Sequence, residues 1–329
     1  MASRPLTFVV GTGRCGSTAL SEVLRLHPHV LSLSELMASL EPGALPEGPL
    51  SGEEFWEILA SPPVFANRLI REGFGLPEHT YPGLGGRFSA EGAEGSGIPA
   101  VALTTLPHLS DDPDALFDAL RPVLGARPRG PVGDHHRALF DALAERFDSR
   151  AVVERSGFSL RLVPRLREVF PEARFVHLYR DGADCALSMS RHPGFRMIQL
   201  MREGGDVPGE LAALMSDESA EVKPLLTRPV PVSAFGRLWS DTVVEGMAYL
   251  DALPAGLVLP LSYEALLDAP DAELTRLAAH LGVEPLSGWL AGARVLLDGG
   301  RRGSAERLPP AELAALRESC RAGARALGV

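Results

Sequence analysis

The sequence predicts an α/β fold in which helices flank a central parallel sheet. Short apolar runs of the kind that form buried strands alternate along the chain with longer segments of helical periodicity. A glycine-rich turn joins the first of these runs directly to the first helical segment. Because parallel strands need long crossover connections, and helices supply them, this alternation favours a parallel sheet over an antiparallel one.

The expected elements follow one another in a regular order. Strands are expected at 6–10, 30–33, 151–154, 174–179 and 257–261. Helices are expected at 17–26, 134–146, 160–170, 182–190, 232–253, 271–281 and 309–326. Ser51 opens a capping-box pattern and Asp112-Pro113 a second helix start, so further short helices are expected there. His135 and His136 fall at the start of an expected helix, where we expect them to face solvent rather than a pocket.

Length and composition agree with a globular enzyme, and the length allows one large α/β domain or two smaller ones. The chain has 329 residues, and we expect one domain over 1–329, with an apolar fraction of 45% that is sufficient for a core. No apolar run is long enough to span a bilayer. The N-terminus enters the first expected strand almost at once, so no signal peptide is apparent and we expect a cytoplasmic protein. A net charge of −10 argues against nucleic acid as a partner.

The three cysteines, Cys15, Cys185 and Cys320, are widely spaced and odd in number. This usage argues against a disulfide framework and against a metal site, and it favours a reducing compartment. Cys15 and Cys185 each lie beside one of the motifs described below, and we expect both to be small buried residues that fill space.

The turn at residues 11–18 is expected to bind an anion. Its glycines let the backbone curl tightly and approach a ligand closely. The free N–H groups at the start of the following helix, together with the positive end of its dipole, then favour a phosphate or a sulfate.

Two known patterns of nucleotide-binding turn can be compared with this one. Gly11 and Gly16 have the spacing of a Walker P-loop, but Ser17 stands where that loop requires lysine. Gly11, Gly13 and Gly16 also match the dinucleotide fingerprint G-x-G-x-x-G, and Glu35 follows near the place of a ribose-binding acid. A dinucleotide-dependent oxidoreductase is therefore one interpretation of the turn.

A phosphosulfate-binding loop is the other interpretation that fits. In such a loop a basic residue inside the turn and a pair of hydroxyls after it hold a sulfonated nucleotide. Arg14, Ser17 and Thr18 match that requirement and have no task in a dinucleotide turn. The turn by itself leaves the dinucleotide and phosphosulfate interpretations open.

A second motif lies in residues 171–191. The apolar run 175–179 has the character of a buried strand and ends at Arg180, after which Asp181 caps a helix. Ser188 lies two turns along that helix. A guanidinium and a hydroxyl placed in this way can hold a second phosphate.

Together the two motifs resemble those of the sulfotransferases that use 3′-phosphoadenosine 5′-phosphosulfate (PAPS). The segment 170–181 is very similar to that family's second motif, and 300–304 resembles its Arg-Lys-Gly loop. Residues 261–267 resemble the segment that precedes this loop, so the matches span 6–304 in the order of the family, whereas 40–148 matches nothing. The resemblance implies a P-loop-like three-layer fold and PAPS as the cofactor, with adenosine 3′,5′-bisphosphate as the spent product.

The resemblance also implies which residues hold the cofactor. It assigns the 5′-phosphosulfate to Gly13, Arg14, Cys15, Gly16, Ser17 and Thr18. It assigns the 3′-phosphate to Arg180, Ser188, Arg301, Arg302 and Gly303. A dinucleotide interpretation leaves this second group without a role. A relative that binds the nucleotide without catalysis is a further alternative, against which the presence of a base candidate argues.

A base and a cation for the leaving phosphate are implied in the same way. Glu35 is the expected base for the proton of the acceptor hydroxyl or amine, because the branch that sulfonates proteins, glycans and lipids has a glutamate after its second strand. His108 is the rival, since the small-molecule branch uses a histidine, although Leu-Pro-His-Leu matches its pattern inexactly. Arg14 and Arg155 are the expected cations; Arg155 stands where the glutamate-using branch has a lysine.

The acceptor itself has no signature in the sequence. Two regions, about 40–148 and 193–230, are expected to form the walls or lid of its pocket. A small metabolite or a lipid-like alcohol is the expected acceptor, ahead of a protein tyrosine or a glycan. The sequence does not predict an oligomeric state.

Overall fold

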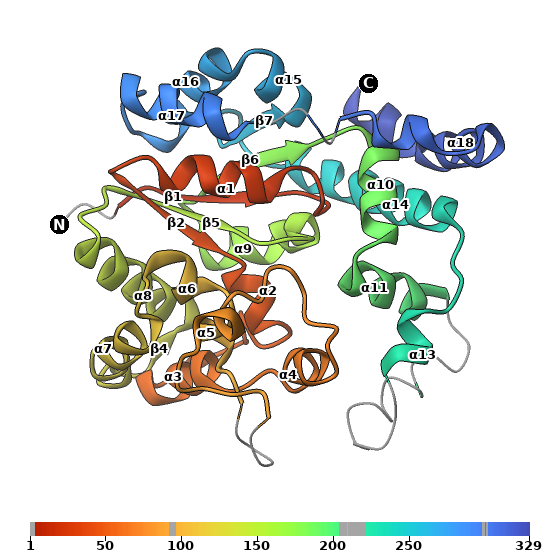
Figure 1. The fold of residues 1–329 in the computed structure, drawn as a ribbon. Coiled ribbons are helices and arrows are strands. Elements are labelled where there is room, and N and C mark those ends of the chain that lie inside the picture. The colour runs from red at the N-terminus through yellow and green to blue at the C-terminus, as the bar shows by residue number, and fades with distance from the viewer. Residues whose placement is uncertain (1–3, 92–96, 204–208, 210–221, 298–299, 301) are drawn as a thin grey trace.

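The computed structural model describes residues 4–91, 97–203, 209, 222–297, 300 and 302–329. Its centre is a five-stranded sheet of order β2-β5-β1-β6-β7, in which all neighbouring strands run parallel (Figure 1). The strands are β1 (Leu6–Val10), β2 (Val30–Ser34), β5 (Ala151–Arg155), β6 (Arg174–Tyr179) and β7 (Val258–Ser262). A second, two-stranded sheet pairs β3 (Pro49–Leu50) with β4 (Gly130–Pro131) in antiparallel fashion. The predicted α/β fold with a central parallel sheet is confirmed.

Helices connect the strands. From the N-terminus to β5 they are α1 (Ser17–Arg25), α2 (Leu36–Leu40), α3 (Gly52–Ala60), α4 (Val64–Arg71), η1 (Tyr81–Leu84), α5 (Ala100–Leu103), α6 (Thr105–Leu109), α7 (Pro113–Gly125) and α8 (Val132–Arg146). Between β5 and β7 they are η2 (Ser159–Leu162), α9 (Val163–Val169), α10 (Gly182–Ser190), α11 (Pro193–Glu203), α13 (Val222–Leu226) and α14 (Val232–Asp251). After β7 they are α15 (Tyr263–Asp268), α16 (Pro270–Leu281), α17 (Ser287–Leu296), η4 (Ser304–Arg307) and α18 (Pro310–Leu327).

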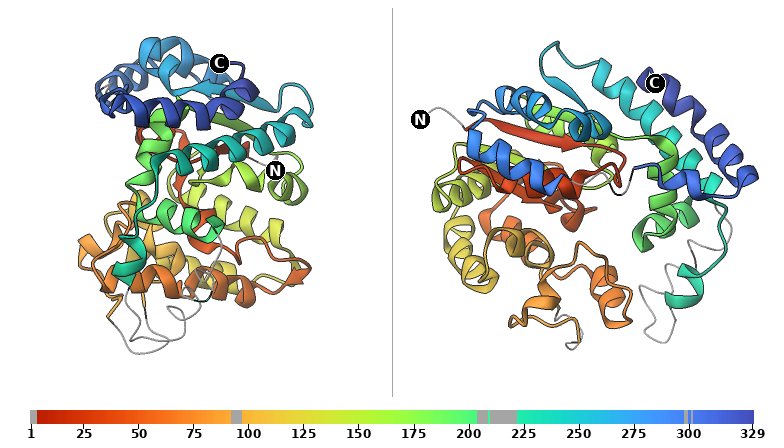
Figure 2. Two further views of the ribbon diagram at one scale, coloured as in Figure 1. Left: turned by 90° about the vertical axis from the view of Figure 1, so that its right-hand side faces the viewer. Right: turned by 45° about the horizontal axis from the view of Figure 1, so that its top comes forward.

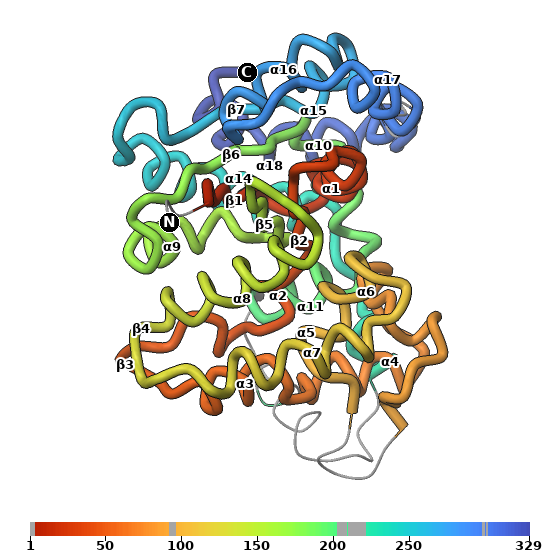
Figure 3. The backbone as a smooth tube through the Cα atoms, turned by 90° about the vertical axis from the view of Figure 1, so that its left-hand side faces the viewer, coloured from red at the N-terminus to blue at the C-terminus, as the bar shows by residue number. Residues whose placement is uncertain are grey.

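The sheet is buried on both faces, because successive side chains of each strand point to opposite sides. In β1, Leu6, Phe8 and Val10 belong to a core that they share with α3, α7 and α8. Val9 belongs to a second core on the other face, shared with α1, α10, α14 and α16. Figures 2 and 3 show the helices of residues 40–148 on one side of the sheet and α15 to α17 on the opposite side. The result is three layers, helix–sheet–helix.

The parallel pairing aligns the ends of four strands. β1 ends at Val10, β2 at Ser34, β5 at Arg155 and β6 at Tyr179, and Ser34 pairs directly with Arg155. The residues that follow each strand therefore lie along one edge of the sheet, where open α/β sheets bind their ligands.

One expectation about the connecting helices is wrong. His135 and His136 do not face solvent; they are 1% and 0% exposed. Their Nε2 atoms lie 2.7 and 2.8 Å from the carbonyl oxygens of Leu50 and Ala44. Because α8 packs against α3 as well as the sheet, its first turn is buried rather than exposed. Burial lowers the pKa of His136 to about 4, so this ring is neutral near pH 7.

Within the described residues, each helix is either too short or too polar to cross a bilayer.

Candidate functional site

The glycine-rich turn has a left-handed backbone conformation, which residues with side chains rarely adopt. Gly13 and Gly16 have φ angles of 72° and 94°, and Arg14 between them has 57°. A Cβ atom on Gly16 would lie 2.2 Å from the ring of Tyr263, so this position excludes any other residue. The turn delivers the chain into α1 with Ser17 and Thr18 as its first two residues, whose N–H groups have no partner inside the helix.

The cysteines near the two motifs are structural. Cys15 and Cys185 are 1% and 0% exposed, as expected for residues that fill space. Burial raises the pKa of Cys15 to about 11 and raises the pKa of Cys185 well above its ordinary value, so both are thiols near pH 7. Among the described residues, no cluster of three His, Cys, Asp or Glu side chains is arranged to hold a metal ion.

The structure brings the two predicted motifs together. The Nε of Arg14 donates a hydrogen bond to Oγ of Ser188 at 3.1 Å. Both residues line a cavity of about 380 Å³, together with Arg180, Arg191, Asp184 and Ser304. Arg180 is buried beneath the ring of Tyr263 and donates to Asp184 at 3.0 Å. A turn near residue 14 and a helix near residue 188 thus form one arginine-lined cavity, referred to below as the basic cavity.

Asp184 organises one end of the basic cavity, and sequence reasoning missed it. Its carboxylate accepts hydrogen bonds from the N–H groups of Gly303 at 2.7 Å and Ala305 at 2.9 Å, as well as from Arg180. This links the C-terminal loop to α10. The available signal was its position four residues after Arg180, on the first turn of a helix.

The predicted C-terminal loop is placed only in part. Gly303 adopts φ 68° and lies against Asp184. Arg302 is exposed and pairs with Asp268 at 2.6 Å; it does not line the basic cavity as described. Arg301 lies outside the described residues.

Glu35 occupies the end of β2 in a constrained position. It has φ 56° and caps α2, which turns its side chain back across the sheet edge. One carboxylate oxygen pairs with Nη1 of Arg155, and the other accepts from the N–H of Gly157 at 2.8 Å. Arg155 also binds Oγ of Ser34 and is 2% exposed. A carboxylate has about four acceptor positions, so Glu35 can still accept from a ligand.

A second buried acid lies next to this pair. Glu154 is 1% exposed, and its Oε1 accepts from Oγ of Ser156 at 2.6 Å and from the N–H of Met37 at 3.2 Å. Burial, with a smaller contribution from the charge of Glu35, outweighs the hydrogen bonds and Arg155 and raises the pKa of Glu154 to about 7. The sequence offered no sign of this, since Glu154 reads there as the last residue of a strand.

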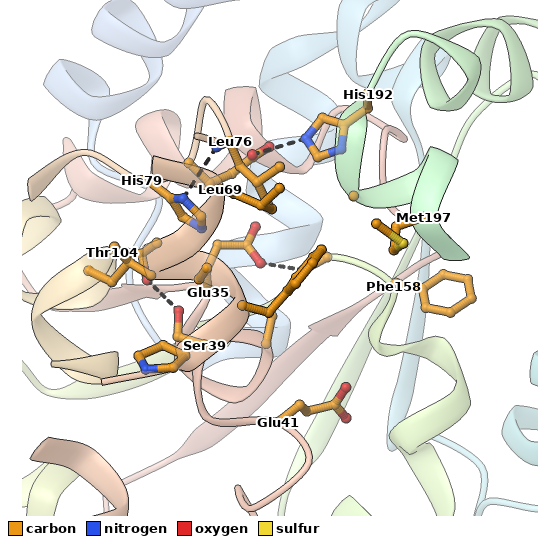
Figure 4. Close-up of a pocket in the computed structure, with 18 of the residues that line it drawn as sticks. Glu35, Ser39, Glu41, Leu69, Leu76, His79, Thr104, Phe158, His192 and Met197 are labelled. Carbon is orange, nitrogen blue, oxygen red and sulfur yellow. Dashed lines mark hydrogen bonds and ion pairs between the residues drawn. The ribbon is translucent and has the colours of Figure 1, made fainter. Parts of the chain in front are cut away.

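Glu35 faces a second cavity, of about 370 Å³, which we call the apolar cavity (Figure 4). Its walls come from both regions expected to surround an acceptor: Leu69, His79 and Thr104 from 40–148, and Phe195 and Met197 from 193–230. His108, the rival base, is half-buried on α6 and does not belong to the lining.

Glu78 and His192 stand where the two cavities meet. His192 lines both of them. Glu78 binds Nε2 of His192 at 3.1 Å with one oxygen and Nη1 of Arg14 at 3.0 Å with the other. Burial opposes ionisation of Glu78, but His192 and Arg14 outweigh it and hold its pKa at about 2. Sequence reasoning missed Glu78, because the irregular stretch around it has no periodicity.

The strand order bears on the dinucleotide interpretation. In the dinucleotide-binding fold the second strand lies beside the first, which brings its terminal acid to the ribose. Here β5 lies between β1 and β2, and Arg155 stands between the glycine-rich turn and Glu35. Glu35, the acid that matched the fingerprint, is therefore two strands away from β1 rather than one, and it is paired with Arg155 of the strand in between.

Comparison with known proteins gives a likeness of fold. No protein-family model matches the chain, and no curated protein matches its sequence. The sulfotransferase domain of the Synechococcus PCC 7002 olefin synthase matches 96% of this chain and 94% of its own, at 16% identity and a TM-score of 0.50. The sulfotransferase domain from the curacin biosynthetic pathway matches 95% and 82%, at 18% identity and a TM-score of 0.49. A sulfotransferase from Alicyclobacillus acidocaldarius matches 99% and 95%, at 17% identity and a TM-score of 0.44.

The chain therefore has an α/β fold of the sulfotransferase, P-loop-like type, as its motifs predicted. At this identity the likeness extends to the fold and not to the chemistry.

Proposed function

We propose that this chain is a PAPS-dependent sulfotransferase whose domain covers 1–329 and whose regions 40–148 and 193–230 wall the acceptor site. The observation that carries the proposal is the hydrogen bond between Arg14 and Ser188. It joins the two motifs expected to hold the 5′-phosphosulfate and the 3′-phosphate into one cavity. A dinucleotide enzyme has no use for that junction.

The lining of the basic cavity fits a ligand with several negative charges. Arg14, Arg180 and Arg191 contribute guanidinium groups, and Ser188 contributes a hydroxyl. Asp184, the one carboxylate among the described lining residues, already accepts hydrogen bonds from Arg180 and from two backbone N–H groups. Arginine keeps its charge at all relevant pH values and offers paired donors to phosphate oxygens.

Glu35 is the proposed base. When bound, PAPS supplies the sulfuryl group: the acceptor oxygen bonds to sulfur while the bond from sulfur to the 5′-phosphate oxygen breaks, and the phosphate keeps the electron pair. Glu35 takes the proton that the acceptor hydroxyl loses. Arg155 and the N–H of Gly157 both bind the carboxylate of Glu35, which lines the apolar cavity, and these contacts support Arg155 as the group that orients the proposed base.

Arg14 is the proposed cation for the leaving phosphate, because it lies on the turn and at the junction of the cavities. As in phosphoryl transfer, positioning and charge stabilisation account for most of such catalysis. The expected setting is the cytoplasm, where PAPS and reduced thiols occur together.

Calorimetric titration with adenosine 3′,5′-bisphosphate, alongside NADH, tests the proposal. We expect the bisphosphate to bind at micromolar concentration or tighter and NADH not to bind. Arg180→Ala should weaken the binding of the bisphosphate by about 1.5–3 kcal/mol, because it removes one charge-assisted hydrogen bond. Arg129→Ala, which removes an exposed arginine that pairs with Glu54 and lies outside the described lining of the cavity, serves as the matched control. Binding of NADH alone would overturn the proposal in favour of a dinucleotide enzyme.

A further inference from the structure

We infer that the acceptor is an uncharged, largely apolar alcohol whose hydroxyl lies between Glu35 and His79. This rests on the proposed function and concerns the apolar cavity alone.

The walls of this cavity are mostly hydrocarbon. Phe65, Leu69, Leu76, Phe158, Phe195 and Met197 contribute to them. Phe158 and Phe195 meet edge to face, with ring centroids 5.7 Å apart, so this wall is a fixed aromatic surface. A volume of about 370 Å³ suits a compact organic molecule.

The charges around the cavity cancel. None of the described lining residues is a lysine or an arginine, so nothing in the lining favours an anionic acceptor. Three carboxylates reach it, and each is already paired: Glu35 with Arg155, Glu41 with Arg161 and Glu78 with Arg14. A cationic acceptor would have to compete with these arginines. A neutral molecule avoids the free-energy cost of burying a charge.

His79 supplies a directed hydrogen-bond donor. Its Nδ1 accepts from the N–H of Leu76 at 3.2 Å, so the neutral ring carries its proton on Nε2. Burial lowers the pKa of His79 to about 4, against the charge of Glu78, which keeps the ring neutral near pH 7. Figure 4 shows the ring of His79 and the carboxylate of Glu35 on the same wall of the cavity. With its proton on Nε2, His79 is a donor and cannot act as the base.

A hydroxyl is the group that satisfies both side chains. It donates its hydrogen to Glu35 and accepts from Nε2–H of His79 with an oxygen lone pair. An ammonium group has hydrogens for Glu35 but no lone pair for His79. The pair therefore selects an alcohol over an amine, and the walls select an apolar one.

Binding of three eight-carbon probes tests the inference without any sulfuryl transfer. 1-Octanol, 8-hydroxyoctanoate and octylamine are titrated into the protein saturated with adenosine 3′,5′-bisphosphate. We expect 1-octanol to bind at least tenfold tighter than the other two. Equal or tighter binding of 8-hydroxyoctanoate or octylamine overturns the inference, and so does the absence of 1-octanol binding. Failure of the proposed function shows separately, as failure of the bisphosphate itself to bind.

Two matched pairs of variants sharpen the test. Ala66→Lys places a cation in the lining, so it should weaken the binding of 1-octanol and strengthen the binding of 8-hydroxyoctanoate. Val64→Lys, on the same helix but 57% exposed and outside the lining, should change the affinity for neither probe. His79→Phe should weaken 1-octanol about tenfold and leave the bisphosphate unchanged, and His79→Gln, which keeps a donor, should restore most of the loss. An unchanged 1-octanol affinity in Ala66→Lys or His79→Phe contradicts the inference.

Discussion

The two cavities meet at His192 but are built in different ways. The described lining of the basic cavity comes mainly from the turn after β1 and from the segment that runs from the end of β6 through α10, with Pro77 and Ser304 beside them, and it includes three arginines. The apolar cavity consists of long connections and helices between β2 and β5 and after α10, and its lining is largely hydrocarbon. The first is fixed by the sheet; the second is fixed by packing among loops and helices.

In the proposed function this difference separates two tasks. The basic cavity offers guanidinium and N–H groups to the proposed cofactor, which is the same in every reaction. The connecting segments carry the surface proposed to contact the acceptor, and such segments tolerate change because they are not part of the sheet. The Arg14–Glu78–His192 contacts lie between the two surfaces.

The sharpest way to break the comparison is to remove the proposed base. Glu35→Gln should lower turnover by about 100-fold or more, because an amide cannot take the acceptor proton, while the bisphosphate binds as before. Release of adenosine 3′,5′-bisphosphate in the presence of acceptor measures turnover. Glu41→Gln, which changes a carboxylate of the same cavity that pairs with Arg161, should stay within a few-fold of the wild type.

A thermal melt accompanies that experiment, since Glu35→Gln leaves the buried Arg155 with a neutral partner. Removal of one partner of a buried ion pair lowers the free energy of unfolding by several kcal/mol at most, so we expect the variant to remain folded at moderate temperature. Wild-type turnover in a folded Glu35→Gln protein rules out Glu35 as the base.

The rigidity of the glycine-rich turn can be tested with two glycines of similar backbone conformation. Gly16→Ala should cost about 2–4 kcal/mol, from left-handed strain plus overlap with Tyr263. Gly48→Ala, with φ 77° and open space around it, should cost about 1 kcal/mol from strain alone. Urea unfolding measures both. Equal losses would show that Tyr263 moves aside easily and that the turn is not tightly enclosed.

Glu154 should make stability fall as the pH rises. Its pKa is about 7 in the fold against an ordinary 4.5, so between these values the folded chain holds a proton that the unfolded chain has lost. Stability therefore decreases from pH 4.5 to 7 by up to about 3 kcal/mol and stays reduced above that.

Glu154→Gln keeps the acceptor oxygen and should remove this dependence. Comparison of the two proteins by urea unfolding at pH 5 and pH 8 isolates the effect. Buried histidines such as His136 and His177, whose pKa values fall to about 4, act in the opposite direction in both proteins and cancel in the difference. Identical pH profiles for the two proteins contradict the assignment.

The smallest expected effect lies at the junction of the cavities. Glu78→Gln removes a negative charge that lies 3.0 Å from Arg14, so the bisphosphate should bind about three- to tenfold tighter. The gain should shrink as salt is added, because charges are screened. Glu41→Gln, which does not touch Arg14, should bind the bisphosphate as the wild type does. Weaker binding in Glu78→Gln would mean that Glu78 orients Arg14 rather than opposing the ligand.

The part of the molecule that the sheet determines was predictable. Strand positions follow from apolar runs, and parallel strands place the residues after them on one edge. The junction of Arg14 with Ser188, and the position of Glu35 at the end of β2, both follow from that rule. The sequence did not predict the strand order. A long connection between two strands does not determine beside which existing strand the next one pairs.

The part that packing determines was not predictable. The region 40–148 was expected to wall the acceptor pocket, but Glu78 and His79 lie in a glycine-rich stretch without periodicity, so nothing in the sequence indicated which of its residues reach the cavities. Asp184 falls within the expected helix 182–190, and its sequence context gives no sign that it accepts a hydrogen bond from Gly303 of the C-terminal loop. His135 was expected in solvent because its local pattern says nothing about α3, which covers it.

The central position of β1 has a consequence for how the chain folds during synthesis. β1 precedes both of its partners in the chain, since β5 and β6 come from beyond residue 150. Its backbone N–H and C=O groups cannot form the hydrogen bonds of the sheet until those strands have been made, and contacts between residues so far apart in sequence make folding slow. We therefore expect β1 to be a segment that a chaperone shields during synthesis.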